Sequence, residues 1–93
     1  MSDRILRQTS LFPGDESTPP FRIVLWTRDP DGRLATHMQV EPGERAQTLG
    51  TYRVWGHYHG WDNLAADKDF EARMRDYDLA EVTPPDATLA PPS

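Results

Sequence analysis

The chain has 93 residues, no cysteine and a formal net charge of −5 at pH 7. This length predicts one compact domain, and the absence of cysteine excludes a disulfide framework and a thiolate zinc site. Residues 1–12 contain no apolar run of signal-peptide length, and no segment approaches the roughly 18 apolar residues of a spanning helix. We therefore expect a cytoplasmic protein with no membrane anchor, stabilised by packing alone.

The negative total hides an uneven distribution of charge. Residues 21–60 carry five arginines against four acidic residues, whereas residues 61–93 carry three basic residues against eight acidic ones. The net charge opposes non-specific attraction to nucleic acid or to an anionic membrane. The two halves of the chain nevertheless offer different surfaces to a partner.

Both ends of the chain contain polar, proline-rich stretches. Residues 13–20 (PGDESTPP) and 83–93 (TPPDATLAPPS) lack the apolar side chains that a packed core needs. We expect residues 1–20 to be mostly flexible and residues 83–93 to form a disordered tail. The apolar residues before the first stretch are candidates for a short docking strand: Ile5, Leu6, Leu11 and Phe12.

A hairpin is predicted over residues 21–41. Residues 21–28 are dense in β-branched and aromatic side chains, and residues 29–32 (DPDG) match a type I turn. Residues 33–41 then alternate between apolar side chains at even positions and polar ones at odd positions, which is typical of a half-buried strand. The simplest arrangement is an antiparallel pair.

A third strand and one helix are predicted after the hairpin. Residues 51–59 resume the alternation, and Asp62 or Asn63 can cap a helix over residues 63–77. The apolar face of this helix is formed by Ala66, Phe70, Met74 and Tyr77. Residues 21–82 are therefore expected to form an α+β domain. In it, a three-stranded antiparallel sheet is packed on one face by a single C-terminal helix.

The length of the first hairpin loop decides which side chains share a face of the sheet. A four-residue loop pairs Arg28 with Arg33, whereas a three-residue loop with Gly32 as a bulge places His37 among core residues. We favour the four-residue loop because its apolar faces agree. The core face then carries Phe21, Ile23, Leu25, Leu34, Met38, Val40, Tyr52, Val54 and Tyr58.

The opposite face of the predicted sheet is the candidate functional surface, because one helix covers only one side. Apart from Glu41, it lacks acidic residues. It is expected to carry Arg22, Val24, Trp26, Arg28, Arg33, Ala35, His37, Gln39, Arg53, Trp55, His57 and His59.

The leading hypothesis is a non-enzymatic interaction module. Tryptophan and arginine are enriched at protein-binding hot spots, and a core of about 60 residues is marginal enough to favour burial of this face against a protein partner or a second copy. The residues predicted to contact the partner are Arg22, Trp26, Arg28, Arg33, Arg53 and Trp55.

Two alternatives use the same face. Aromatic rings interleaved with arginines can hold single-stranded nucleic acid, although the acidic total disfavours it. His37, His57 and His59 can instead offer three imidazoles to one metal ion. No P-loop, dinucleotide-binding, HExxH or GxSxG motif is present, so neither an enzyme nor a cofactor is predicted.

Overall fold

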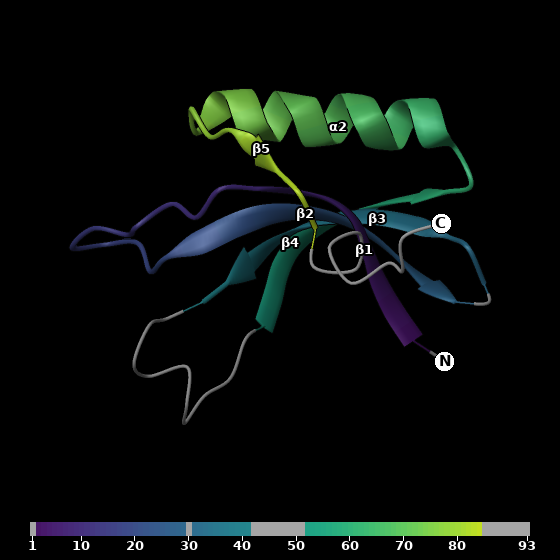
Figure 1. The fold of residues 1–93 in the computed structure, drawn as a ribbon, viewed down its shortest axis with the longest axis horizontal. Helices are drawn as coiled ribbons and strands as arrows, with labels where there is room; N and C mark the ends of the chain where they lie inside the picture. Colours follow the sequence, from purple (N-terminus) through teal and green to yellow (C-terminus); the bar gives the residue numbers. More distant parts are fainter. Residues whose placement is uncertain (1, 30, 42–51, 85–93) are drawn as a thin grey trace.

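The computed structural model describes residues 2–29, 31–41 and 52–84. These residues form an α+β fold in which one helix lies across an antiparallel sheet with the strand order β4-β3-β2-β1-β5 (Figure 1). In chain order the elements are β1 (Ser2–Thr9), β2 (Phe21–Asp29), β3 (Leu34–Val40), β4 (Tyr52–Gly60), α2 (Asn63–Asp76) and β5 (Glu81–Val82). The connection over residues 42–50 and the tail from residue 85 lie outside the described residues.

The sheet has five strands, so the prediction of three was wrong. β1 pairs with β2 from Ser2↔Asp29 to Gln8↔Val24, and β5 pairs with β1 on its other side. β2 is buried on both faces, and its second edge needs hydrogen-bond partners that only another strand can supply. β1, which lies outside the predicted domain of residues 21–82, provides these partners. A pairing of this kind leaves little trace in the local sequence.

The register of the first hairpin agrees with the prediction. β2 and β3 pair without interruption from Phe21↔Val40 to Thr27↔Leu34, the spacing of a four-residue connection. Pro30 within that connection lies outside the described residues. Because the register is regular, the predicted faces of these two strands are correct.

β4 departs from the prediction because it contains a β-bulge. Between the pairs Met38↔Val54 and Thr36↔His57, β4 has one more residue than β3. Trp55 in the bulge has a φ of 52°, which is rare for a bulky residue. The extra residue reverses the side of the sheet to which each following side chain of β4 points. His57 therefore lies on the helix side, the face that α2 covers, and Tyr58 lies on the open side, the face that α2 leaves uncovered.

Gly56 explains why the bulge occurs there. A Cβ atom at this position would lie 2.2 Å from Nε2 of His37, so only glycine lets the strand pass over that ring. A second register shift near Gly60 leaves His59 as another extra residue of β4.

α2 connects one edge of the sheet to the other. At the start of the helix, the side chain of Asp62 accepts a hydrogen bond from the Ala65 N–H, as expected of an N-cap. Beyond its end, Asp78 has a φ of 54°, and the Leu79 N–H donates to the Met74 carbonyl. Fourteen residues span about 21 Å, close to the roughly 19 Å across five strands. The helix length therefore suits the crossing that brings β5 beside β1.

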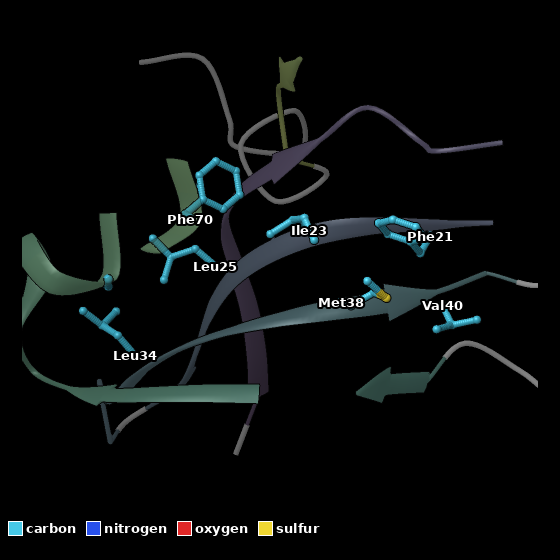
Figure 2. Packing of buried hydrophobic residues seen from close by; sticks show 8 residues of the cluster. Phe21, Ile23, Leu25, Leu34, Met38, Val40 and Phe70 are labelled. Atoms are coloured by element: carbon cyan, nitrogen blue, oxygen red, sulfur yellow. The ribbon is translucent and has the colours of Figure 1, made fainter. Parts of the chain in front are cut away.

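The core lies between α2 and the sheet. Phe70 of α2 is fully buried, and Figure 2 shows it near Leu25 and Ile23 of β2. Within the part of the chain that the structure describes, no helix is long and apolar enough to cross a membrane. The buried cluster consists of Phe21, Ile23, Leu25, Leu34, Met38, Val40, Ala66 and Phe70.

One arginine joins three elements at the edge of this core. Arg7 of β1 forms ion pairs with Asp67 and Glu71 of α2 and with Glu81 of β5, at 2.7–3.1 Å. Its guanidinium carbon also lies 4.7 Å from the centroid of the Phe70 ring. The pKa of Arg7 is raised, chiefly by its hydrogen bonds to Glu81, so the charge is permanent.

Candidate functional site

The centre of the open sheet face is a row of three rings. The indole Nε1–H of Trp26 donates to Nδ1 of His37 at 2.9 Å, and the Tyr58 hydroxyl lies 3.4 Å from Nε2 of His37. An indole N–H can only donate, so Nδ1 of His37 is unprotonated and the neutral ring carries its proton on Nε2. β2, β3 and β4 thus each contribute one side chain to a polar aromatic row.

His37 is electrostatically suited to stay neutral. Burial lowers its pKa from the usual 6.5, and the positive charge of Arg53 acts in the same direction. Arg53 lies over the Trp26 ring, with 4.3 Å between the guanidinium carbon and the ring centroid. Trp26 is only partly exposed, and this cation covers one face of its ring.

The arginines of this face are paired with carboxylates, contrary to the expectation of a face almost free of acidic groups. Asp3 of β1 lies 3.0 Å from Arg28 and 3.3 Å from Arg53, and Arg22 pairs with Glu41. The hydrogen bond from Arg28 is the largest effect lowering the pKa of Asp3. The pairing of Asp3 depends on β1 joining the sheet, so the sequence of residues 21–60 gives no sign of it.

A pocket of about 310 Å³ opens at one end of this face. Tyr58, which is 78% exposed, and the half-buried Trp26 line it together with Arg28, Arg33 and Asp31. Next to it, the Arg33 guanidinium carbon lies 5.1 Å from the centroid of the Trp61 ring. The indole of Trp61 donates to the Asp31 carbonyl. Neither Tyr58 nor Trp61 was among the predicted contact residues.

The helix side of the sheet carries a second cluster, centred on Asp69 of α2. Nδ1 of His57 lies 3.0 Å from Asp69, and the buried hydroxyl of Thr36 donates to the same carboxylate. Nε2 of His59 is 3.6 Å from Asp69, and Nε of Arg73 is 3.5 Å from it. Asp69 was not among the predicted site residues. The isolated glycine at position 56 is the sequence feature that could have indicated a bulge, and this bulge turns His57 toward Asp69.

The partners of Asp69 keep it ionised. Burial acts to raise the pKa of Asp69, but hydrogen bonds from Thr36 and His57 and the charge of Arg73 outweigh burial and hold the pKa below its usual value. The carboxylate fixes the His57 ring with its Nε2 directed away from Asp69. Thr36 is fully buried, so its hydroxyl is closed to a substrate.

The predicted set of site residues is divided between the two sides of the sheet. Trp26, Arg28 and Arg33 meet at the open-face pocket, and Arg22 and Arg53 lie on that face, whereas Trp55 lines hollows on the helix side. The three histidines predicted to offer ligands to one metal ion are not brought together, because the bulge separates His57 and His59 from His37. No group of three or more metal-ligating side chains suited to an ion occurs in residues 2–29, 31–41 and 52–84.

Comparison with protein-family models, with curated protein sequences and with solved structures gives no significant match.

Proposed function

We propose that this chain is a non-enzymatic interaction module that binds a protein partner through its open sheet face. The observation that carries the proposal is the pocket of about 310 Å³ with Tyr58 and Trp26 in its walls and two arginines at its rim. Tyrosine, tryptophan and arginine are the side chains most enriched where binding energy concentrates. We call Trp26, Arg28, Arg33 and Tyr58 the open-face patch.

The charges around the patch favour an acidic partner. Three guanidinium groups, from Arg28, Arg33 and Arg53, share two carboxylates, from Asp3 and Asp31. The Arg28 and Arg33 side chains are each more than half exposed, and exposed ion pairs are weak enough for a partner carboxylate to compete. A second copy of the chain qualifies as the partner, since the helical half of the chain is rich in acidic residues.

The same geometry disfavours nucleic acid as the ligand. Asp3 and Glu41 stand among the arginines, where their carboxylates would repel a phosphate backbone. The stacking face of Trp26 is occupied by Arg53 at 4.3 Å, which leaves Tyr58 as the open ring of the row. A protein carboxylate beside an apolar anchor fits this surface better than a run of phosphates.

Two measurements on the full chain test the proposal. Sedimentation equilibrium from low micromolar to millimolar concentration measures self-association, and selection from a random-peptide display library measures binding to other sequences. We expect a dimer, or acidic peptides with an apolar anchor, whose affinity falls about 30-fold in Tyr58→Ala, a typical hot-spot loss. Arg33→Gln should weaken the same complex, more so at low salt.

Trp55→Gly is the matched control, because it removes an exposed ring from the other side of the sheet. It should leave the complex unchanged. A chain that stays monomeric throughout and selects no peptide overturns the proposal. So does a complex that persists in Tyr58→Ala and is lost in Trp55→Gly.

A further inference from the structure

Two adjoining hollows lie on the helix side of the sheet, between α2, β4 and the segment before β2. They have volumes of about 380 and 400 Å³ and share Met38, Trp55 and Tyr77 as common walls. The first is polar at its far end, and the second is lined mainly by apolar side chains, including Phe21, Val40 and Val54. Together they form a groove with one charged end and one apolar end, which we call the helix-side groove.

The bulge in β4 gives the groove its exposed aromatic wall. Trp55 is 69% exposed and holds a left-handed backbone conformation that costs a bulky residue free energy. Bulges often redirect side chains beside functional sites. Here the bulge directs Trp55 and His57 to the same groove. Tyr77, the C-cap residue of α2, lines the groove from the helix.

Among the described residues that line the polar end, there is one more carboxylate than there are guanidinium groups. Asp69 and Arg73 compensate each other at 3.5 Å, and His57 is bound to Asp69 through Nδ1. Asp76 also lines this end, and in the described part of the chain it has no ion-pair partner. It stands in the last turn of α2, where the helix dipole already presents negative carbonyl ends. A ligand cation would relieve this local excess.

We propose that the helix-side groove binds a small primary amine with an apolar chain. The ammonium group pairs with Asp76 and lies by the Trp55 and Tyr77 rings, an arrangement that favours organic cations. In the neutral tautomer of His57, Asp69 accepts the Nδ1–H, and Nε2 is left to accept a hydrogen bond from the ammonium group. The alkyl chain extends along Met38 into the apolar hollow.

The opposite ligand charge fits less well. A carboxylate would need Arg73, whose charge Asp69 already compensates, and it would face Asp76 at the negative end of α2. A neutral alcohol could occupy the apolar hollow but would leave the charge of Asp76 unpaired. This site is separate from the open-face patch, so the proposal does not rest on the proposed function.

A series of probes with the same chain and different head groups tests the charge preference. Hexylamine, hexanol and hexanoate are titrated into the ¹⁵N-labelled full chain, and backbone amide shifts report both affinity and location. We expect affinity to fall from amine to alcohol to carboxylate, with shifts at Val54, His57 and Tyr77. From butylamine to octylamine, each methylene that enters the hollow should raise affinity about fourfold.

Two variants test the residues that carry the proposal. Asp76→Asn should weaken hexylamine about fivefold, the upper range for an exposed ion pair. Trp55→Gly should weaken it about tenfold, and because glycine adopts a positive φ without strain, the fold should not suffer. Asp31→Asn is the control with the same change of charge on the opposite face, and it should bind hexylamine like the wild type.

The outcomes separate this site from the open-face patch. Tyr58→Ala must leave hexylamine binding unchanged, whether or not it weakens a protein complex. Three results overturn the proposal: hexanoate binding as tightly as hexylamine, hexylamine binding that survives both Asp76→Asn and Trp55→Gly, or no amide shift with millimolar amine.

Discussion

The contact between Gly56 and His37 yields a sharp test of the β4 bulge. In Gly56→Ala the new Cβ would lie 2.2, 2.6 and 2.8 Å from three atoms of the His37 ring, so the ring must move by more than 1 Å. Overpacking of this kind costs about 1–3 kcal/mol. If the ring retreats from Trp26, an indole N–H also loses its partner, at a further cost of about 1–3 kcal/mol. Because Trp26 is only half-buried, water can replace part of the lost hydrogen bond, so we expect a total in the lower part of the combined range, roughly 2–4 kcal/mol.

A double-mutant cycle isolates the steric origin of that loss. In a His37→Ala background the obstructing ring is gone, and φ at position 56 is not in the left-handed range. Gly→Ala should then be neutral or stabilise the fold by about 0.5 kcal/mol, through the lower entropy of the unfolded chain. The two substitutions should therefore couple by about 3 kcal/mol.

Urea denaturation followed by circular dichroism and by tryptophan fluorescence measures all four proteins of the cycle. Equal m-values would show that the change is in stability rather than in the unfolded state. If Gly56→Ala costs the same with and without His37, the ring does not select glycine at this position. A neutral Gly56→Ala in the wild type would contradict the bulge geometry itself.

Three further perturbations test the core, the ionised groups and the Arg7 network. Phe70→Ala should cost about 3–5 kcal/mol, because the ring is fully buried, and a melting temperature within a few degrees of wild type would refute its placement. Hydrogen bonds from Arg7 are the largest effect holding the pKa of Glu81 below the usual 4.5. For Asp69, burial acts to raise the pKa, but the partners of the ionised carboxylate outweigh burial and hold the pKa below the usual 3.8. The stability this gives is present above those values and lost as the pH falls below them. Burial lowers the pKa of His37, so the unfolded chain takes up a proton first and stability should begin to fall below pH 6.5. Urea midpoints across pH should flatten near pH 6 in His37→Gln, and an unchanged profile would contradict this. Arg7→Met should cost about 1–2 kcal/mol, less in molar salt, because three neighbouring carboxylates lose their cation. A loss that does not respond to salt would assign the cost to packing instead.

Local patterns were sufficient for the first hairpin and the helix. The four-residue turn signature and the alternation that follows it carry the register from Phe21↔Val40 to Thr27↔Leu34. The apolar spacing at Ala66 and Phe70 and the cap at Asp62 carry the helix and its buried face. In each case the interactions that decide the structure join residues close in the chain.

The candidate site was predictable only in part. Trp26 and His37 belong to the regular hairpin, so their position on the open face follows from alternation. Tyr58 and His57 come after the bulge, and alternation assigned each of them to the wrong side. Alternation therefore placed Trp26 and His37 on the correct side, while the bulge divides the three histidines between the two sides of the sheet.

The amino-acid sequence by itself determined the class of fold, the hairpin register, the helix and the presence of an arginine- and tryptophan-bearing sheet face, because periodicity, turn residues and capping act over a few residues. Only the tertiary structure decided the places of β1 and β5, the pairing of Asp3 with two arginines, and the side on which each residue after Gly56 lies. The physical reason is that one inserted residue inverts every later side chain of a strand. Whether a strand accepts that insertion depends on the ring packed beneath it, which belongs to the neighbouring strand.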